Sequence, residues 1–342
     1  MNKQILVTGG TGLIGGEVVL SLARTGYAVC ALARAADDAQ AAKRLQGRLA
    51  KSDQYDAGLL GAVEAIAGDT ALPHFGIDPE RARGVSAIVH CAADTSFRES
   101  DSVWQTNVRG ATNLVELARR AAPDSRVVFV STASVATGPT GRVIGEEDGE
   151  ACHENTYTRS KREAERIVEG SGLDAVIVRP SIVLSRGVHD RSMARSILWA
   201  IPIMSEIGQV PVEPGSHVDL VPADFVAHAI AQIATRPKLG FRRYHVSAGD
   251  TSETFGDLLE HLGERFPWMQ RIRALGARMR TSRAMGPLAS YIPFINADVR
   301  YSNARLFSEL GNFGLPPRAS SYLETLFERI SLPEAYAEMA RP

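Results

Sequence analysis

Residues 3–16 read KQILVTGGTGLIGG, in which a short apolar run at 5–8 leads into glycines at positions 9, 12 and 15 and then into an amphipathic helical pattern. After a strand, the first glycine permits a tight turn, the second lets backbone amides approach a pyrophosphate, and the third lets the helix pack closely on the strand. The helix dipole favours an anion here. A glycine-rich turn can exist without a ligand, but strand, turn and helix in this order are the context that dinucleotide binding requires. We expect the dinucleotide to contact Thr8, Gly9, Thr11, Gly12, Leu13 and Ile14.

Strand-like runs alternate with helical stretches through the first half of the chain, at 28–33, 63–67, 87–90, 127–131 and 175–178. Nearly continuous apolar strands separated by helices indicate a parallel sheet that is covered on both faces. Right-handed crossovers between such strands then favour a doubly wound α/β fold of the Rossmann type.

The sequence changes character after Ser185, where prolines and glycines interrupt shorter helical patterns. Strand-like runs return only at 218–221 and 244–247. We expect the interrupted part to be mainly helical and to bind the substrate. The chain is therefore divided into a dinucleotide-binding domain, 1–185 with 216–250, and a smaller substrate lobe, 186–215 with 251–342.

Composition and charge exclude several classes of function. With 342 residues, 44% of them apolar, and a formal net charge of −1, the chain can bury a full core and has no general attraction for nucleic acid. Its three cysteines are odd in number and lack ligand-like spacing, which indicates neither a disulfide framework nor a metal site. The longest apolar run is too short for a transmembrane segment, and the first strand begins too early for a signal peptide. These features predict a globular, cytoplasmic protein.

Arg34 stands at the end of the expected second strand, where NAD-selective folds commonly place a carboxylate for the ribose 2′-hydroxyl. A carboxylate there would repel a 2′-phosphate, whereas Arg34, helped by Arg44 on the next helix, can make charge-assisted hydrogen bonds to it. This favours NADPH over NADH. Two observations keep the other interpretation open: an exposed loop arginine can lack a ligand, and Asp37 and Asp38 follow closely.

Tyr157 and Lys161 lie four residues apart in the charged helical stretch ENTYTRSKREAERIV. Residues at this spacing share one helix face, so the ammonium can lie near the phenol and stabilise its phenolate. A tyrosine with an ordinary pKa of about 10 is a poor acid at neutral pH without such a cation. The pair also occurs by chance on solvated helices, but here it follows a strand of the expected sheet. We therefore expect both residues to be catalytic.

The strand-like run RVVFVSTASV ends in hydroxyl side chains, Ser131, Thr132 and Ser134. A hydroxyl at a strand end can hydrogen-bond a substrate oxygen on which negative charge develops. We choose Thr132 as the third catalytic residue, with Ser131 and Ser134 as competitors. All three hydroxyls could instead only satisfy backbone groups at the strand end.

Taken in order, these motifs resemble the extended short-chain dehydrogenase/reductase family over roughly the first 250 residues. The matching segments are TGGTGLIG, the pair Gly-Asp at 68–69, HCAADTSF, NVRGATNLVELA, VSTASV, YTRSK and VRPSIV. The resemblance implies that Asp69, followed by Thr70, contacts the adenine and that Ala92 and Ala93 line the pyrophosphate and ribose. It also places Asn107 in the cofactor site as a support for the active-site helix.

The same resemblance assigns a second role to the catalytic pair. Tyr157 and Lys161 would hold the nicotinamide ribose as well as act in catalysis. The backbone at Pro180, Ser181 and Ile182 would meet the nicotinamide amide. The resemblance therefore predicts that the cofactor's reactive ring lies between the helix that carries the pair and the strand that ends at VRPSIV.

Within this family the chain is most similar to the thioester reductase and fatty acyl-CoA reductase branch, which carries the male sterility type of NAD-binding domain. The supporting segments are ALARAADDAQAAKRL, AGDTALPHFGI, STASVATG, HVDLVPADFVAHAIAQIA and NADVRYSNARLFSELG. The branch implies that NADPH delivers a hydride to the carbonyl carbon of an acyl thioester, bound to CoA or to a carrier protein. The product would be an aldehyde or, after a second round, an alcohol.

Three other functions stay open from the sequence. An aldehyde or ketone reductase would use the same three side chains for a single hydride transfer. A nucleotide-sugar epimerase or dehydratase would return the hydride and retain NAD, which Arg34 and the segment VDLVPADF disfavour. A cofactor-sensing or scaffold protein has no evident need for both Tyr157 and Lys161.

Five arginines alternate with apolar residues at helix-like intervals late in the chain: Arg271, Arg273, Arg278, Arg280 and Arg283. Such a basic amphipathic stretch can dock an acidic carrier protein, the phosphates of CoA or an anionic lipid surface. A lobe helix with its polar face in water explains the same pattern. The apolar residues at 197–207 likewise fit either an acyl pocket or ordinary core packing. We expect a monomer or a homodimer.

Overall fold

A computed structural model of the protein describes residues 3–97, 100–136, 141–148, 155–186, 200–276 and 292–329. Its centre is a seven-stranded parallel sheet with the strand order β12-β7-β5-β4-β1-β2-β3. The order reverses at β1, which lies between β2 and β4, as expected for a doubly wound sheet. The predicted Rossmann-type α/β fold is therefore confirmed. The strands are β1 (Gln4–Thr8), β2 (Ala28–Ala33), β3 (Val63–Ala67), β4 (Ala87–His90), β5 (Arg126–Val130), β7 (Asp174–Pro180) and β12 (Arg243–Val246).

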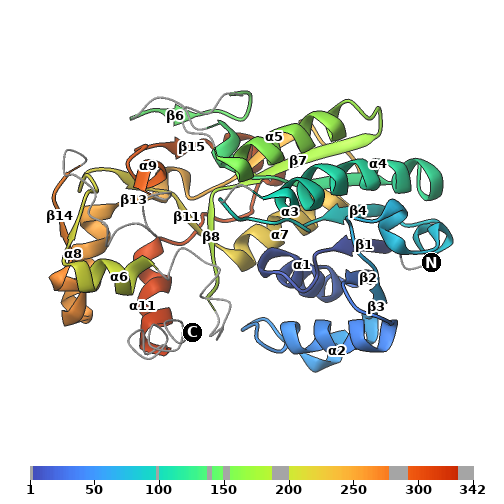
Figure 1. Ribbon diagram of the computed structural model, residues 1–342, viewed down its shortest axis with the longest axis horizontal. Helices are drawn as coiled ribbons and strands as arrows, with labels where there is room; N and C mark the ends of the chain where they lie inside the picture. The colour runs from blue at the N-terminus through green and yellow to red at the C-terminus, as the bar shows by residue number, and fades with distance from the viewer. Residues whose placement is uncertain are drawn as a thin grey trace.

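Helices cover both faces of this sheet (Figure 1). One face carries α1 (Leu13–Arg24), α2 (Asp38–Leu49) and α7 (Ala223–Thr235), and the other carries α4 (Gly110–Ala121) and α5 (Thr156–Glu169). Side chains of β1 alternate between the faces, because Ile5 and Val7 belong to the core beneath α1 and α7 while Leu6 belongs to the core beneath α4 and α5. The sheet is thus buried on both sides, as its continuous apolar strands predict.

A π-helical turn, Gln105–Arg109, joins α3 (Asp101–Trp104) to α4 without a break in the helix. The turn lies in the segment that follows β4 and leads onto the face occupied by α5. Such π-turns are rare and are frequently found at functional sites. The sequence pattern predicted a helix here but gave no sign of the extra residue in this turn.

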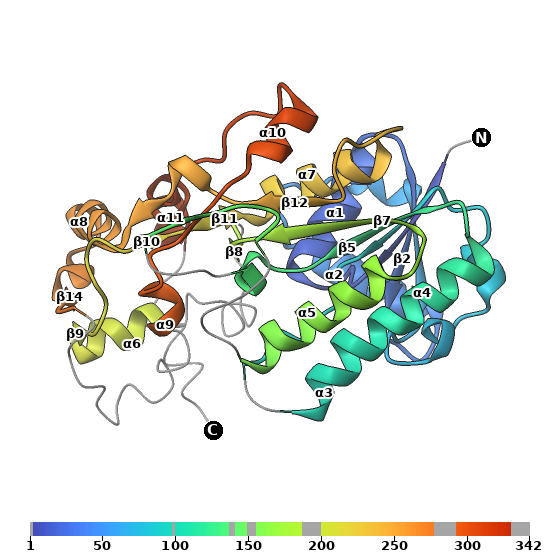
Figure 2. The same cartoon turned by 90° about the horizontal axis from the view of Figure 1, so that it is seen from above.

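The remaining helices pack mostly into a second core beside the main sheet (Figures 1 and 2). These are α6 (Ala200–Ile207), α8 (Phe255–Arg265), α9 (Ile292–Ile295) and α11 (Ala319–Arg329). One helix of the same region, α10 (Ala304–Leu310), instead packs on β12 of the main sheet. The short strands of the described chain pair in four two-stranded sheets, β10-β13, β11-β8, β14-β9 and β15-β6. They are β6 (Val143–Ile144), β8 (Ile182–Leu184), β9 (Gln209–Val210), β10 (His217–Val218), β11 (Leu220–Pro222), β13 (Glu253–Thr254), β14 (Arg273–Ala274) and β15 (Arg300–Tyr301).

Two kinds of strand prediction need correction. β5 ends at Val130, one residue earlier than predicted, so Ser131 lies beyond the sheet, and β7 continues to Pro180. β12 likewise begins and ends one residue before the predicted 244–247. The run at 218–221 is not a single strand, because β10 pairs with β13 and β11 pairs with β8.

The division between β10 and β11 falls at Asp219, a buried carboxylate. Its Oδ1 accepts a hydrogen bond from the amide of Ala248 (2.7 Å), and its Oδ2 accepts one from the amide of Tyr301 (3.3 Å). The side chain therefore joins the point between the two short strands to two other segments of the chain. No helix within the described ranges has the length and apolar character of a membrane span.

Candidate active site

The glycine turn lies at the point where the strand order reverses, between the carboxyl ends of β1 and β4. Gly9 has a positive φ of 70°, and a Cβ at this residue would lie 2.6 Å from the amide nitrogen of Ala92 and 2.8 Å from the carbonyl carbon of Cys91. Only glycine allows the two chains to approach so closely. The turn therefore packs directly against the chain that follows β4.

The next two glycines shape the start of α1. The amide of Gly12 donates to the carbonyl of Gly9 (2.8 Å), and Gly12 caps the helix; no side chain in the described chain caps this first turn. A Cβ at Gly15 would lie only 2.2 Å from the carbonyl oxygen of Gly9. The first turn of α1 thus presents its free amides where a phosphate group can bind. This cradle of main-chain atoms fits a pyrophosphate.

Thr8 was predicted to contact the dinucleotide, but its side chain is fully buried. Its Oγ1 lies 3.0 Å from Nδ1 of His90 and accepts a hydrogen bond from the amide of Ala92 (3.4 Å). Burial, together with the charge of Lys161, lowers the pKa of His90 to about 3, so its ring is neutral. The hydroxyl therefore holds β1 to β4, which leaves the main chain of Thr8 for a ligand.

Arg34 follows β2 and is exposed, and Arg44 on α2 donates from Nη1 to the carbonyl of Arg34. The side chain of Arg44 therefore lies against the main chain of Arg34, so the two residues are neighbours in the fold. The nearby carboxylate of Asp37 caps α2 by accepting from the amide of Gln40 (2.8 Å). It is therefore already used by the helix.

Asp38, the second carboxylate near Arg34, is also bonded within the protein. Its Oδ1 accepts from the amide of Ala67 (2.7 Å), and its Oδ2 pairs with Arg81 (2.7 Å). These two interactions hold the pKa of Asp38 below its usual value. Both acidic residues after β2 are therefore engaged within the protein, and neither carboxylate is free to bind a ribose hydroxyl.

Arg48 supports the cradle, a role that the sequence analysis missed. From α2 its Nε donates to the carbonyl of Gly12 (3.0 Å), and its Nη2 donates to the carbonyl of Leu13 (3.0 Å). It also pairs with Glu17 of α1 (3.2 Å). The arginine lies 36 residues from Gly12 in the chain, and no spacing pattern connects them.

The residues predicted to contact the adenosine half lie at the ends of β3 and β4. Asp69 accepts a hydrogen bond from the amide of Ala71 (3.0 Å), and its own amide donates to the carbonyl of Phe75 (2.8 Å). Thr70 is buried, and its carbonyl accepts from Nδ2 of Asn113 on α4 (2.8 Å). Of the two alanines that follow β4, Ala92 is partly buried and Ala93 is exposed.

Asn107 lies in the π-helical turn and is buried. Its Oδ1 accepts from the amide of Asp94 (2.8 Å), while its Nδ2 donates to the carbonyl of Asp94 (2.9 Å) and to Oγ of Ser160 on α5 (2.9 Å). The side chain therefore ties the loop after β4 to the helix that carries Tyr157 and Lys161. This arrangement supports a positioning role.

The start of α5 is fixed by a capping box. Oδ1 of Asn155 accepts from the amide of Thr158 (2.9 Å), and Oγ1 of Thr158 accepts from the amide of Asn155 (3.0 Å). The box satisfies two amide groups that would otherwise lack partners. Tyr157 therefore enters the first turn of a well-defined helix, and Lys161 follows one turn later.

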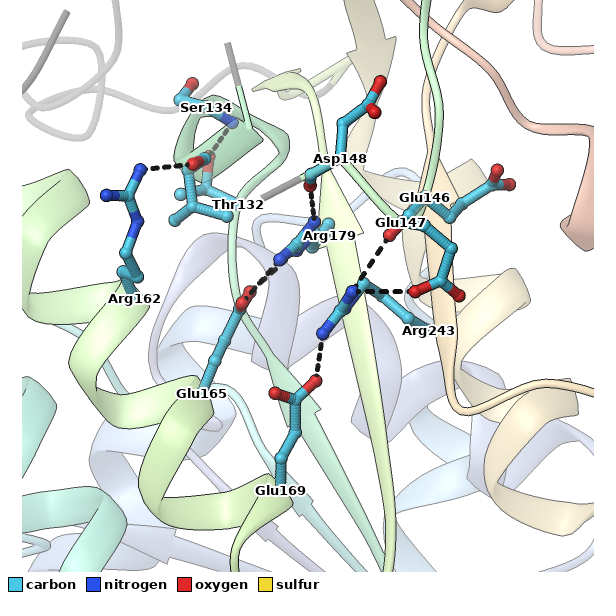
Figure 3. Close-up of polar contacts among 11 residues, drawn as sticks. Thr132, Ser134, Glu146, Glu147, Asp148, Arg162, Glu165, Glu169, Arg179 and Arg243 are labelled. Atoms are coloured by element: carbon cyan, nitrogen blue, oxygen red, sulfur yellow. Dashed lines mark hydrogen bonds and ion pairs between the residues drawn. The ribbon is translucent and has the colours of Figure 1, made fainter. Parts of the chain in front are cut away.

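Tyr157 and Thr132 are brought together by the structure. The phenol is hydrogen-bonded to Thr132, and its ring stacks with Phe97 at a centroid distance of 6.1 Å. Thr132 also accepts from the amide of Ser134 (3.3 Å; Figure 3). Ser131 is buried beyond the end of β5. Of the three candidate hydroxyls, Thr132 is the one that acts on the pKa of Tyr157.

Lys161 is buried, with 1% of its surface exposed. Its Nζ donates to the carbonyl of Val130 (2.7 Å) and lies 4.2 Å from the ring centroid of Phe129. Burial lowers the pKa of Lys161 to about 8, and the nearby Glu165 opposes this shift. The ammonium thus lies under the end of β5, one helical turn from the tyrosine.

The electrostatics of the pair differ from the prediction. Burial raises the pKa of Tyr157 to about 12, and the opposing influence is the hydrogen bond with Thr132. The expectation that the lysine cation makes this phenol unusually acidic is therefore wrong for this arrangement, because burial raises the pKa and the group that opposes it is Thr132, not Lys161. The phenol is protonated at neutral pH and can act as a proton donor.

The strand end that was predicted to meet the nicotinamide is held from two sides. The amide of Ser181 donates to the carbonyl of Val246 (3.1 Å), and the amide of Ile182 donates to the carbonyl of Asp219 (3.1 Å). Pro180, the last residue of β7, has no amide hydrogen. Amide groups of this segment are therefore used within the fold.

The basic stretch after residue 270 is only partly described. Arg271 ends a 3₁₀ turn and Arg273 begins β14, so this part is not the helix that the spacing predicted. Both arginines are exposed. Arg278, Arg280 and Arg283 lie outside the described residues, as do Ile197, Leu198 and Trp199 of the candidate acyl pocket.

The apolar residues of α6 that the structure describes pack inside the second core. Met204 is buried there, and Ile201, Ile203 and Ile207 pack against it in part. Core packing explains these four side chains. Within the described residues no cluster of histidine, cysteine, aspartate and glutamate is arranged to hold a metal ion.

The chain is similar in sequence to parts of larger known proteins. The chain is 28% identical over 287 residues to the nonribosomal peptide synthetase asaC of Aspergillus flavus, which covers 76% of this chain and 28% of the relative. It is 29% identical over 229 residues to a putative fatty acyl-CoA reductase of Drosophila melanogaster, covering 55% of this chain and 42% of that protein. This chain therefore spans less than half the length of either relative.

A solved thiolation-reductase di-domain from an archaeal nonribosomal peptide synthetase has a closely similar fold. The superposition has a TM-score of 0.81 at 19% identity and covers 98% of this chain and 76% of the other. At sequence level, the male sterility protein family matches residues 7–230. The chain therefore belongs to that family, whose members are NAD(P)-binding reductases of the extended short-chain dehydrogenase/reductase type.

Proposed function

We propose that this chain is an NADPH-dependent reductase that converts an acyl thioester, linked to CoA or to a carrier protein, into an aldehyde. The observation that carries the proposal is the convergence of Thr132, Tyr157 and Lys161 at the sheet edge that also forms the glycine cradle. The relatives named above, a peptide synthetase and a putative fatty acyl-CoA reductase, support the thioester as the substrate class.

The choice of NADPH as the cofactor rests on two groups of residues. The cradle around Gly9, Gly12 and Gly15 would hold the pyrophosphate, and the guanidinium groups of Arg34 and Arg44 would bind the 2′-phosphate of NADPH. The engagement of Asp37 and Asp38 in other interactions supports the same choice. NADH would lose the charge-assisted bonds to the two arginines.

When bound, NADPH would supply the hydride that the carbonyl carbon of the thioester accepts. Thr132 donates a hydrogen bond to the carbonyl oxygen as negative charge develops there. Tyr157 gives its phenolic proton to the same oxygen, because the phenol is protonated at neutral pH. Lys161, a buried cation, stabilises the resulting phenolate. Hydride and proton addition gives a hemithioacetal. When its carbon–sulfur bond breaks, the hydroxyl proton passes to the leaving sulfur, and the products are an aldehyde and a thiol.

A docking role for the basic stretch belongs to the same proposal. Arg271 and Arg273 are exposed on the second core and can attract an acidic carrier protein or the phosphates of CoA. Reversing both charges, Arg271→Glu and Arg273→Glu, should raise the KM for carrier-bound or CoA-bound substrates and leave the KM for a free aldehyde unchanged. Equal effects on both substrate types would remove the docking role.

The main test is NADPH oxidation with acyl-CoA, acyl-carrier, aldehyde and nucleotide-sugar substrates, with identification of the products. We expect turnover with a thioester and release of aldehyde or alcohol, and weaker turnover with NADH. Reduction of aldehydes with no reaction on any thioester would favour a simple carbonyl reductase. A strong preference for NADH would contradict the assignment of Arg34 and Arg44.

A further inference from the structure

Four polar side chains follow one another at four-residue intervals along α5: Tyr157, Lys161, Glu165 and Glu169. Residues at this spacing lie on the same helix face. The first two are the proposed catalytic residues, and the second two reach toward the sheet from successive turns of the helix (Figure 3). The catalytic face of α5 therefore continues as a row of carboxylates.

Glu165 forms a buried, two-pronged ion pair with Arg179 of β7. Nε of Arg179 donates to Oε1 of Glu165 (2.9 Å) and Nη2 donates to Oε2 (2.7 Å), while both side chains have less than 5% of their surface exposed. Nη1 of Arg179 also donates to the carbonyl of Asp148 (3.1 Å; Figure 3). Arg179 directly precedes Pro180, so the pair links α5 to the strand end that faces the nicotinamide in the proposed function.

A buried ion pair of this kind needs a reason other than stability. Removing two charges from water is costly, and well-packed apolar residues in the same place are often as stabilising or more so. Such pairs are better explained when they fix one arrangement of neighbouring groups. Here the neighbour is Lys161, which lies one helical turn from Glu165 and is itself buried.

The groups around Lys161 on the sheet side carry no charge. Burial raises the pKa of the Cys91 thiol to about 12 and lowers the pKa of His90 to about 3, so both are neutral at physiological pH. β5 contributes the ring of Phe129 and the carbonyl of Val130, which are also uncharged. The sheet therefore offers the ammonium a dipole and a ring but no anion among these groups.

The helix side supplies the missing charge. Tyr157 is a protonated phenol. Glu165 is the carboxylate that raises the pKa of Lys161 against the effect of burial, and the Cys91 side chain has a smaller effect in the same direction. Arg179 of β7 faces Glu165 and fixes its position. An uncompensated ammonium at this depth would lose its proton or leave its position.

We propose that the Glu165 carboxylate, held by Arg179, is the counter-charge that keeps Lys161 in place as a buried cation and that fixes α5 against the sheet. Both are positioning residues, since neither touches the reacting atoms. The inference rests on the proposed function, in which Lys161 acts as a cation beside Tyr157.

The chain offers a matched control one turn further along the helix. Glu169 pairs with Arg243 of β12, the neighbouring strand, so it has the same chemistry and the same kind of partner (Figure 3). Its side chain is 39% exposed, and it is two turns from Lys161 instead of one. Glu169→Gln removes a similar ion pair without removing the proposed counter-charge.

The first experiment measures the titration of Lys161 directly, without substrate or cofactor. The chain contains only five lysines, so NMR of protein with ¹³C-labelled lysine can resolve them, and Lys161→Met identifies the signal. We expect a titration near the pKa of about 8 in the native protein. In Glu165→Gln it should fall by about one pH unit or more, because the opposing charge is lost. In Glu169→Gln it should not move.

The second experiment asks whether activity follows the same titration. The alkaline limb of kcat/KM should move to lower pH in Glu165→Gln, since the cation is lost at lower pH, and should return in Glu165→Asp, which restores the charge. The double variant Glu165→Gln with Arg179→Met leaves no unpaired arginine. Its alkaline limb should still lie at a lower pH than that of the native protein. A titration of Lys161 that is unchanged in Glu165→Gln would overturn the inference.

The two experiments separate this inference from the proposed function. If the native protein did not reduce any thioester, the proposed function would be contradicted, but the NMR titration of Lys161 could still show the effect of Glu165. If the Glu165–Arg179 pair had a purely structural role, Glu165→Gln would lower the midpoint of urea unfolding but would leave the titration of Lys161 unchanged. That result would also reject the counter-charge.

Discussion

The cradle and the catalytic helix are two halves of one site that are built by opposite means. The cradle is mainly one stretch of main chain, with Arg48 of α2 as a support, and it is shaped by glycines whose missing Cβ atoms allow contacts as short as 2.2 Å from where a side chain would begin. The catalytic helix is held by buried polar side chains from distant parts of the chain, such as Asn107 and Arg179. Changes in the first half should therefore damage binding and folding, and changes in the second half should damage turnover.

The largest expected effect is on turnover. Tyr157→Phe keeps the ring and its stacking on Phe97 but removes the proton donor, so kcat should fall about a thousandfold. NADPH affinity, measured by the change in cofactor fluorescence, should change far less. Unchanged turnover in this variant would require another residue as the proton donor and would remove the assignment of Tyr157.

A glycine substitution should show the opposite pattern. In Gly15→Ala the new Cβ would meet the carbonyl of Gly9, so the cradle must open, with a loss of about 2 kcal/mol in the free energy of unfolding. NADPH affinity should fall with it. Gly47→Ala in α2 is the matched control, because nothing lies within 4 Å of its Cβ, and it should stabilise the protein by about 0.5–1 kcal/mol. Equal urea unfolding curves for the two variants would contradict the steric explanation.

The difference between the two halves also explains what the sequence could predict. The cradle depends on local spacing, so the glycine turn, the strands at 28–33, 63–67 and 87–90 and the parallel sheet follow from pattern alone. The pair Tyr157 and Lys161 is visible for the same reason, since four residues make one helical turn. Local periodicity is the signal in each case.

The long-range supports of both halves could not be predicted from spacing. Asn107 bonds to Ser160 across 53 residues, and Arg48 bonds to Gly12 across 36; the role of Asn107 came from the family resemblance, and that of Arg48 was missed. No spacing connects such pairs, because the fold alone brings them together. The prediction for the pKa of Tyr157 was wrong for a related reason: the sequence places a cation one helical turn away, but it does not show how far the folded chain shields the phenol from water.

Two asparagines on the same continuous helix allow a direct comparison of the two halves. Asn107 bonds to the loop after β4 and to α5, whereas Asn113 bonds to the carbonyl of Thr70 near the adenosine end. Each Ala variant leaves buried polar groups without partners and should lose about 1–3 kcal/mol of stability. Steady-state kinetics should then separate them.

Asn107→Ala should lower kcat about tenfold or more, since small misplacements of catalytic groups are costly. Asn113→Ala should mainly raise the KM for NADPH. If both variants altered kcat and KM in the same proportion, the two halves would have to be regarded as one unit.

The smallest expected effect concerns the edge of the cradle. Arg34 is exposed, so its charge-assisted bond to a 2′-phosphate is weakened by solvent, and Arg34→Ala should raise the KM for NADPH by about tenfold. The KM for NADH should stay the same, because NADH has no phosphate at that position. Arg120→Ala, an exposed arginine on α4, provides the control for a general loss of positive charge. Equal losses with both cofactors would mean that Arg34 supports the loop and does not read the phosphate, and the choice between NADPH and NADH would then depend on Arg44.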